Sequence, residues 1–491
     1  MSTERSPWGA LGALCVGYFM ILLDMTIVAV ANPAIMTSLH TDMSEVIWVT
    51  SAYLLTFAVP LLVTGRLGDR FGPKYLYLGG LSVFTVASLW CGLADGIGSL
   101  IAARAVQGLG AALMAPQTMA VIGRIFPADK RGAAMGVWGG VAGVATLIGP
   151  VFGGALIDNG GWQWIFYVNV PIGLVAFALG VWLVPALPTN RHRFDVPGVI
   201  VVAISMSALV FGIQEGNSYH WAGWVWALIL GGLVVLTAYL IYQGRNRIEP
   251  LVPLGLFRDR NFALGNVATG ALGAAMTAQM VPSYFYLQAV RDLSPTEAAL
   301  VFAPMAVLSG VLSPVVGRLS DKLPPRYLPT FGFLLFTAGL LWFIGLATPH
   351  GSIALICVMS AVCGIASACI WAPLPATALR NLPLRQLGAA SGIYNTTRQV
   401  GSVLGSAGIG ALITARLTAH ALPTSSADAG HVDDAIKAPY ASAMTDSLYL
   451  TVGLLVVCAV AAAFFATGAR PAAAPAPAPA ADREEPADLA G

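Results

Sequence analysis

The feature that most restricts the fold is a series of fourteen apolar runs, each close to the length of a transmembrane helix. A helix of about twenty residues crosses roughly 30 Å of hydrocarbon and satisfies its backbone hydrogen bonds internally. The runs cover 9–31, 46–64, 75–94, 98–122, 132–157, 164–185, 196–214, 223–243, 262–288, 298–316, 328–347, 353–375, 388–414 and 447–468. We therefore expect an all-α integral membrane protein that passes through the bilayer many times.

Composition supports a lipid environment. Of 491 residues, 57% are hydrophobic and 10% are charged, more apolar surface than a water-soluble core could hide. The net charge of +2 gives no reason to expect a nucleic-acid partner. The six cysteines lie in apolar runs without a CxxC pair, which predicts neither disulfides nor a metal site. The first run continues past signal-peptide length without a cleavage site, so we expect it to remain as a span.

The distribution of basic residues predicts the orientation. Twenty of the 25 Lys and Arg residues fall on one side of the proposed arrangement, and Arg291, Arg416 and Lys437 fall on the other. Cytoplasmic loops carry the excess of Lys and Arg in membrane proteins. The pattern therefore predicts a multi-pass protein of the cell (inner or plasma) membrane with both termini in the cytoplasm.

An internal repeat predicts two related halves. Residues 65–75 realign on residues 317–327 with identity at six of eleven positions, and both copies lie between two apolar runs. Duplicated halves are typical of transporters in which one bundle rocks against the other around a central site. The expected units are an N-terminal six-helix bundle (1–185), two additional helices with their connecting loop (186–261), a C-terminal six-helix bundle (262–468) and a disordered Ala/Pro-rich tail (469–491).

Three motifs carry a resemblance to a known family. The stretch Gly65-x-Leu-Gly-Asp-Arg-x-Gly-x-Lys74 resembles motif A of the major facilitator superfamily, Arg104-x-x-Gln-Gly108 resembles its motif B, and Gly149-Pro-x-x-Gly-Gly154 resembles its motif C. Segments 23–33, 162–171 and 388–401 are similar to the fourteen-span drug:proton antiporter branch. Pro73, Gln163 and Pro324 depart from the family pattern within the loops.

The resemblance covers residues 8–468 and has consequences for fold and function. It implies a major facilitator fold, with two pseudo-symmetric six-helix bundles plus two extra central helices. Motif C is implied to be an antiporter signature, which favours export over uptake.

Asp24 is the candidate proton-coupling residue. It is the one acid in the interior of a predicted span, where an isolated carboxylate anion is costly and should readily accept a proton. The six histidines all fall in loops, so none competes for this role. The alternative is a purely structural role, in which Asp24 caps an irregular helix end near Pro33 or reaches outward to water.

Arg104 and Arg398 are the two cations expected inside spans. Each costs about 2.5 to 3.5 kcal/mol at a helix centre unless it faces a cavity or a partner. Arg104 could assist proton release from Asp24 by favouring the anion, a role that the resemblance also implies for the motif B arginine. The alternative for both is a packing hydrogen bond to backbone carbonyls.

Two sets of residues are candidates for gating. Asp69 and Arg70 lie at the end of the second span and could latch the cytoplasmic side through a partner such as Arg131, with Asp321 as the repeated acid. Gly149, Pro150, Gly153 and Gly154 predict a smooth, bendable helix that slides against a neighbour. The alternatives are a charged loop that enforces topology and ordinary close helix packing.

The signal for substrate contacts is weaker. Polar and aromatic side chains among apolar neighbours are typical of a large, apolar substrate pocket with few hydrogen-bonding groups. The candidates are Gln107, Gln279, Tyr284, Tyr394, Asn395 and Arg398.

These features predict a proton-coupled antiporter that exports lipophilic drug-like or toxic small molecules by alternating access. The alternatives are an exporter of an endogenous metabolite or lipid-like compound, and an uptake symporter. We expect no enzyme activity and no cofactor, because proton motive force would drive transport and no GxxxxGK[ST] loop is present. Neutral or monocationic substrates are expected to be exported better than dications, unless Glu297 reaches the cavity. The exported compound, the proton stoichiometry and the oligomeric state stay open.

Overall fold

The computed structural model describes residues 6–189, 196–245, 254–320, 322–382, 387–422, 432 and 434–467, and its regular elements there are helices. The N-terminal part contains α1 (Pro7–Ser38), α2 (Met43–Phe71), α3 (Pro73–Gly92), α4 (Ile97–Ile125), α5 (Ala128–Gly160), α6 (Trp164–Tyr167) and α7 (Asn169–Leu183). Then come α8 (Val196–Glu215) and α9 (Gly223–Arg245). The C-terminal part contains η1 (Leu254–Arg258), α10 (Arg260–Phe285), η2 (Tyr286–Val290), α11 (Pro295–Ser320), α12 (Tyr327–Leu346), α13 (Ile353–Trp371), α14 (Pro373–Ala378), α15 (Leu387–Ala419) and α16 (Asp434–Ala463).

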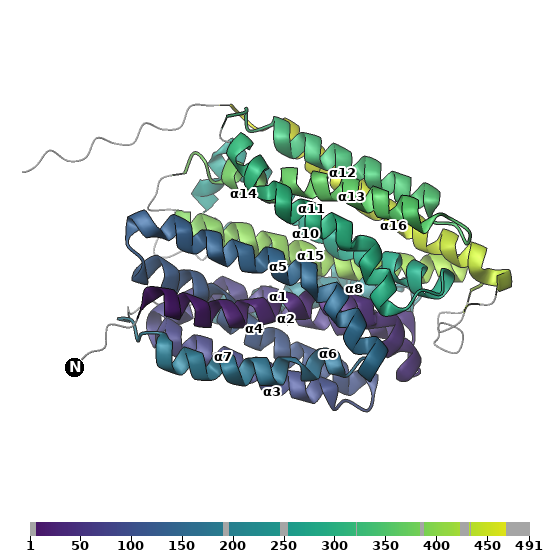
Figure 1. The fold of residues 1–491 in the computed structure, drawn as a ribbon, viewed down its shortest axis with the longest axis horizontal. Coiled ribbons are helices and arrows are strands. Elements are labelled where there is room, and N and C mark those ends of the chain that lie inside the picture. Colours follow the sequence, from purple (N-terminus) through teal and green to yellow (C-terminus); the bar gives the residue numbers. More distant parts are fainter. Residues whose placement is uncertain are drawn as a thin grey trace, which may run out of the picture.

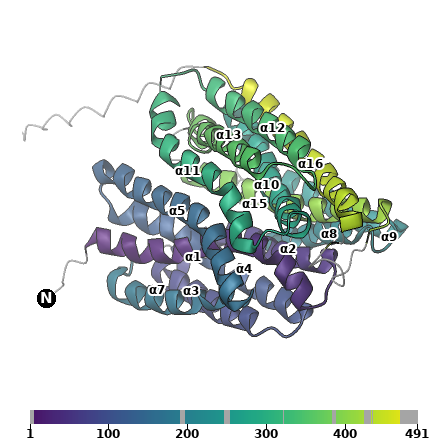
Figure 2. The same cartoon turned by 45° about the vertical axis from the view of Figure 1, so that its right-hand side comes forward.

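The helices form two halves that lie side by side. Helices α1–α7 make up one half and α10–α16 the other, with the helix axes running roughly in one direction through both (Figures 1 and 2). Across the interface α5 packs on α11, and α2 packs on α15. Helix α8 contacts α2 and α15, so this additional helix touches both halves.

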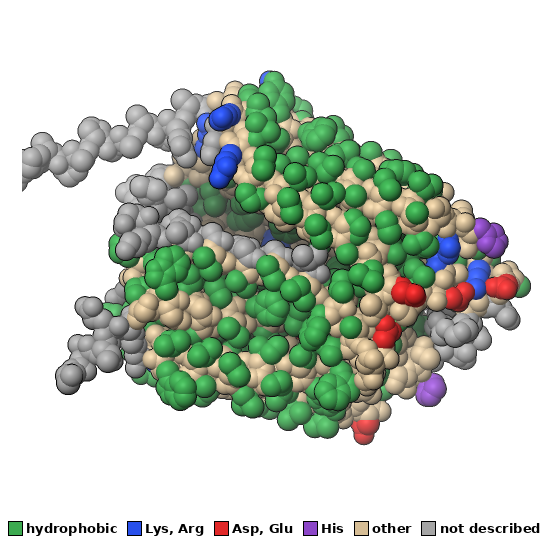
Figure 3. Space-filling view, in the orientation of Figure 1, with side chains coloured by type: hydrophobic (Ala, Val, Ile, Leu, Met, Phe, Trp, Pro, Cys, Tyr) green, Lys and Arg blue, Asp and Glu red, His purple; other side chains and the backbone are tan. Residues whose placement is uncertain are grey.

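Eleven helical segments in the described ranges are long and apolar enough to span a membrane. The chain is thus a multi-pass membrane protein, as the apolar runs indicate. Hydrophobic side chains cover a broad band of both halves, and charged side chains gather toward the two ends of the molecule (Figure 3). Helices α5, α8 and α10 are outside the eleven, although each coincides with a predicted apolar run.

Several helices differ in detail from the apolar runs. The run 164–185 is interrupted at Val168, between α6 and α7, and the run 353–375 is interrupted at Ala372 before α14. Pro373 begins α14 because proline fits the first turn of a helix, where its missing N–H has no helical acceptor. Helix α15 continues past the end of its run at 414, and α16 begins well before the start of its run at 447.

Residues 65–75, the first copy of the repeat, form a helix–turn–helix junction. Helix α2 ends at Phe71 and α3 begins at Pro73, so Gly72 alone connects them. Its φ of +93° is a conformation that glycine adopts without the Cβ clash of other residues. In the second copy a longer segment separates the two helices, since α11 ends at Ser320 and α12 begins at Tyr327.

The two halves touch at one end and separate at the other. The Thr296 N–H donates to the Asp158 carboxylate across 3.2 Å, and the Gln288 amide donates to the Val30 carbonyl across 3.0 Å. The opposite end, where α1 begins, is hollowed between the halves (Figure 3). The molecule is therefore closed at the Asp158 end and open at the end that holds the start of α1.

Candidate functional site

The centre of the site is an ion pair between α1 and α4. Arg104 Nη1 donates to Asp24 Oδ2 across 2.6 Å. The Asp24 side chain is 0% exposed and the Arg104 side chain 1%. Breaking such a buried pair by removing one partner costs about 3–5 kcal/mol, because the remaining charge is left uncompensated. The pair therefore links the first and fourth helices of the N-terminal half.

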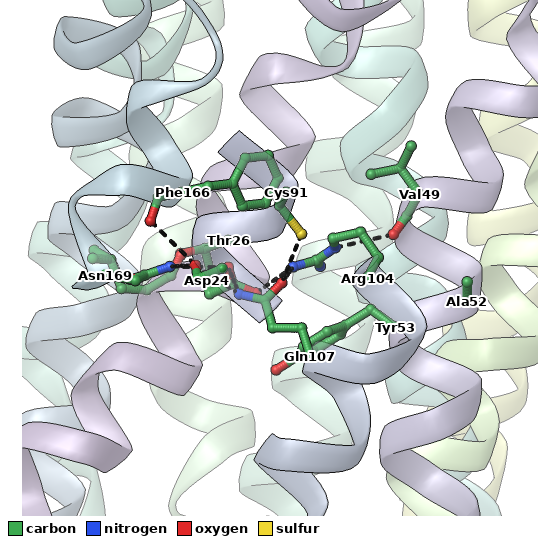
Figure 4. A network of polar contacts seen from close by, with 12 residues as sticks. Asp24, Thr26, Val49, Ala52, Tyr53, Cys91, Arg104, Gln107, Phe166 and Asn169 are labelled. Carbon is green, nitrogen blue, oxygen red and sulfur yellow. Dashed lines mark hydrogen bonds and ion pairs between the residues drawn. The ribbon is translucent and has the colours of Figure 1, made fainter. Parts of the chain in front are cut away.

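Two amides complete the surroundings of Asp24 (Figure 4). Gln107 Nε2 donates to Asp24 Oδ1 across 2.9 Å, and Asn169 Nδ2 donates to the same oxygen across 3.3 Å. Gln107 Oε1 in turn accepts from Arg104 Nη1 at 2.6 Å. Each oxygen of the Asp24 carboxylate thus faces a hydrogen-bond donor.

Ser88 of α3 connects both amides to the backbone. Its hydroxyl oxygen accepts from Gln107 Nε2 at 3.1 Å and from Asn169 Nδ2 at 2.9 Å, and the hydroxyl donates to the Phe166 carbonyl at 3.1 Å. Asn169 is the first residue of α7, directly after the interruption at Val168. The broken span therefore places an amide donor beside Asp24 and supplies a carbonyl acceptor for Ser88.

Arg104 is held on its other sides by α2 and by aromatic rings. Its Nε donates to the Val49 carbonyl across 3.2 Å, and its guanidinium carbon lies 4.1 Å from the centroid of the Tyr53 ring. The Phe166 ring lies 5.7 Å away. Cation–π contacts with desolvated arginine contribute roughly 2 kcal/mol. These contacts keep Arg104 in place independently of Asp24.

Three hydrogen-bond donors surround the Asp24 carboxylate in this conformation. Arg104, Gln107 and Asn169 all donate to Asp24, and a protonated carboxyl would have to displace at least one of these donors. The sequence-based picture of an isolated acid is therefore incomplete, because the charge is compensated within the network.

The glycines of α5 bring this helix against both halves. A Cβ at Gly149 would lie 2.1 Å from Thr26 Oγ1, and a Cβ at Gly153 would lie 2.1 Å from Ile27 Cγ1. A Cβ at Gly154 would lie 2.6 Å from the Cα of Thr296 at the start of α11. The first two glycines thus fit α5 to α1 close to Asp24, and the third fits it to the other half. Pro150 lies between them and is half-buried.

The structure describes few contacts of the charged residues that are candidates for gating. The side chains of Asp69 and Arg131, and the whole of Asp321, lie outside the residues that the structure describes. Arg70 is exposed at the end of α2, with its guanidinium 5.4 Å from the Phe71 ring centroid. The latch remains a prediction.

The substrate candidates are placed in different regions. Gln107 contacts Asp24, whereas Tyr284 is 3% exposed and packs edge-on against Phe302 within the C-terminal half. Gln279 is half-buried, and the nearest contact of its amide is Met276 Sδ at 3.8 Å.

Three further candidates share α15. Tyr394 is 7% exposed, whereas Asn395 and Arg398 are half-buried. The Asn395 amide donates to the Ser391 carbonyl of its own helix. Arg398 lies over the Trp371 ring, with 5.8 Å between the guanidinium carbon and the centroid.

Glu297 is directed away from the centre of the molecule. Its carboxylate accepts from the Ser294 N–H at 2.9 Å, and the Ser294 hydroxyl oxygen accepts from the Glu297 N–H at 3.3 Å. This reciprocal pair is a capping box at the start of α11. In the described parts of the chain, no group of three or more His, Cys, Asp or Glu residues could hold a metal ion.

Sequence reasoning did not identify Ser88, Asn169 or Tyr53 as site residues. Asn169 lies in a segment that resembles the drug:proton antiporter branch, so its position gave a usable signal. Ser88 and Tyr53 lie in otherwise ordinary apolar runs, and only their contacts with Gln107 and Arg104 distinguish them.

Comparison with known proteins agrees with this architecture. Residues 14–406 match the family described as Major Facilitator Superfamily. The chain is 48% identical over 484 residues to the uncharacterized MFS-type transporter Rv1250 of Mycobacterium tuberculosis, covering 96% of this chain and 84% of that protein. It is 33% identical over 413 residues to the tetracenomycin C resistance and export protein of Streptomyces glaucescens, covering 84% and 77%.

A solved structure shares the fold. A bacterial homolog of the human lysosomal transporter Spinster aligns with a TM-score of 0.68 at 17% identity, covering 94% of this chain and 97% of that one. The family match and the named relatives indicate a transporter with a small-molecule substrate rather than an enzyme.

Proposed function

The chain belongs to the Major Facilitator Superfamily, and we propose that it is a proton-coupled antiporter that exports lipophilic small molecules by alternating access. The observation that carries the proposal is the buried Asp24–Arg104 pair with its amide donors. A proton-driven carrier needs a group that changes charge inside the membrane, and an intramembrane carboxylate with a displaceable counter-charge meets that need. Export is favoured over uptake by the resistance and export relative, and by the motif C glycines on α5.

The proposed cycle links protonation to helix packing. In the conformation open at the α1 start, Asp24 is held as an anion by Arg104 at 2.6 Å. When the opposite end opens, water reaches Asp24, and protonation releases Arg104 from its ion pair. The glycines of α5 place this helix in contact with α1 and with the start of α11. A change at Asp24 is thereby transmitted to the interface between the halves.

We propose the finer topology along the same lines. With α5, α8 and α10 added to the eleven candidate spans, the chain would cross the membrane fourteen times. Helices α8 and α9 would then be the two additional helices between six-helix bundles of 1–185 and 262–468. The basic residues favour both termini in the cytoplasm of a cell or inner membrane. The hollow end would accordingly face the cytoplasm.

The test uses everted membrane vesicles that contain the full chain and are acidified inside by respiration. Adding a transported lipophilic compound should collapse part of the pH gradient in wild-type vesicles, because protons leave as the compound enters. Vesicles with Asp24→Asn, at matched protein levels, should show no such collapse. Compound uptake that is equal in both, or that persists after the gradient is abolished, would contradict proton antiport. Accumulation in the reverse direction would instead identify a symporter.

A further inference from the structure

A second group of side chains lies between Asp24 and the open end of the molecule, where α1 begins. The rings of Tyr18 from α1 and Trp138 from α5 stack with centroids 4.5 Å apart and planes inclined by 19°. The Trp138 indole Nε1 is buried, and no acceptor for it lies among the described residues. The N-terminal half therefore presents a flat aromatic surface and one unused hydrogen-bond donor.

The C-terminal half contributes Arg398 of α15, which is half-buried. Its charge is near enough to influence the hydroxyls of Tyr18 on α1 and Tyr394 on its own helix. Its guanidinium carbon lies 5.8 Å from the Trp371 ring centroid. Among the residues that the structure describes, no carboxylate lies within ion-pairing distance of Arg398.

These groups lie at similar depth in the membrane. Trp138 comes ten residues after Ala128, where α5 begins, and Tyr18 and Arg398 each come eleven residues after the start of α1 and α15. At about 1.5 Å per residue, each lies roughly 15 Å from the open end of its helix. Asp24 comes six residues after Tyr18 on the same helix, or about 9 Å further in. A molecule that enters from the open end would meet the aromatic cluster before Asp24.

The charges inside the membrane leave this cluster positive. Asp24 is 0% exposed and already paired with Arg104, so its negative charge is not available to an incoming cation. Arg398 is half-buried and has an aromatic neighbour but no described counter-ion. A desolvated cation beside an incoming cation is unfavourable, whereas an anion would supply the missing partner.

We propose that Tyr18, Trp138, Trp371 and Arg398 form a substrate site for planar aromatic molecules that carry a negative charge. The aromatic plane packs on the outside of the stacked Tyr18–Trp138 pair, whose facing sides already contact each other, while the guanidinium of Arg398 binds the anionic group. The Trp138 N–H donates to a further acceptor. This assignment rests on the proposed transport function, because it names the substrate class of that path. It differs from the sequence-based expectation of neutral or monocationic substrates.

The experiment measures binding and transport separately on the purified full chain. Three probes share one anthracene ring system and differ in their substituent, which is a carboxylate, a hydroxymethyl group or a trimethylammonium group. Binding is followed in detergent by anthracene fluorescence, and transport in proteoliposomes with an imposed pH gradient. The variants are Arg398→Gln, Arg398→Lys and Asp24→Asn.

We expect the wild type to bind the carboxylate at least about tenfold more tightly than the trimethylammonium compound, which is about 1.4 kcal/mol. Arg398→Gln should weaken carboxylate binding about tenfold and change binding of the hydroxymethyl compound less than about twofold, which also shows that the variant is folded. Arg398→Lys should retain part of the preference. Tighter binding of the cation in the wild type, or an unchanged preference in Arg398→Gln, would overturn the assignment.

The two proposals fail in different ways. Asp24→Asn should keep the carboxylate preference in the binding assay and lose gradient-driven transport. Carboxylate binding without any proton-driven movement of the three probes in the wild type would refute the antiport mechanism and leave the site assignment standing. Proton-driven movement of the trimethylammonium compound alone would support antiport and refute the site.

Discussion

Arg104 donates to Asp24 across 2.6 Å in a part of the protein from which solvent is excluded around both side chains. The two residues are 80 positions apart in the sequence and come from α1 and α4. Their pairing joins the candidate proton-coupling acid to the helix that also supplies Gln107.

The pair can be tested by a double-mutant cycle. Asp24→Asn leaves Arg104 buried without its counter-charge and should lower stability by about 3 kcal/mol. Adding Arg104→Gln removes the orphaned charge, so the double variant should recover most of that loss while remaining inactive in proton-driven efflux. Thermal unfolding in detergent and efflux from proteoliposomes measure the two effects. Stability losses that simply add would show that the pair is not energetically coupled.

Asn169 should hold the Asp24 carboxylate within its set of donors. Its amide donates to Asp24 Oδ1 at 3.3 Å and to the Ser88 hydroxyl at 2.9 Å. Asn169→Asp replaces this donor with a second acid beside Asp24, whereas Asn169→Ala removes the donor without adding a charge. Proton-driven efflux at matched protein levels should therefore fall more in Asn169→Asp than in Asn169→Ala; equal losses in both variants would refute the role.

Gly154 should hold the closed end of the molecule together. In Gly154→Ala the new Cβ would lie 2.6 Å from the Cα of Thr296, and backbone cannot move as easily as a side chain. We expect α5 and α11 to separate and the population to shift toward the conformation open at the Asp158 end. A reporter cysteine introduced as Val30→Cys, at a position that is 0% exposed, should then react faster with a membrane-impermeant maleimide.

Gly79 provides the matched control for this test. It lies in α3, and a Cβ there meets no atom within 4 Å. Gly79→Ala should leave labelling of the reporter unchanged. If Gly154→Ala labels no faster than Gly79→Ala, the close contact between α5 and α11 does not control opening.

Glu215 should anchor α8 to the N-terminal half. Its carboxylate accepts from Trp48 Nε1 at 2.6 Å and from the Ser44 hydroxyl at 3.0 Å, both on α2. Glu215→Ala leaves the partly buried indole N–H without its acceptor and should cost about 1–2 kcal/mol in thermal unfolding. Glu215→Gln keeps a carbonyl acceptor and should cost less than half as much. An equal loss in both variants would mean that the charge, rather than the hydrogen bond to Trp48, holds α8.

Much of the fold and part of the site could be predicted from local patterns. The apolar runs identify spans because hydrocarbon demands about twenty apolar residues and internally satisfied backbone groups, conditions that can be checked within one segment. Asp24 and Arg104 are recognisable individually, since a charge in an apolar run is costly wherever the helix packs. The interruption at Val168 was not predicted, although it places Asn169 beside Asp24 and the Phe166 carbonyl within reach of Ser88.

The sequence alone determined that this chain belongs in a membrane, that it is built from two related halves and which charges lie within its spans. Only the tertiary structure decided how those charges are used, because hydrogen bonds and ion pairs depend on distances between helices that no local pattern contains. Asp24 is paired with Arg104 from α4, whereas Arg398 has the Trp371 ring as a neighbour and no carboxylate partner among the described residues. A buried carboxylate attracts a cation only while its charge is unpaired, so the contact with Arg104 decides whether Asp24 can attract a cationic substrate.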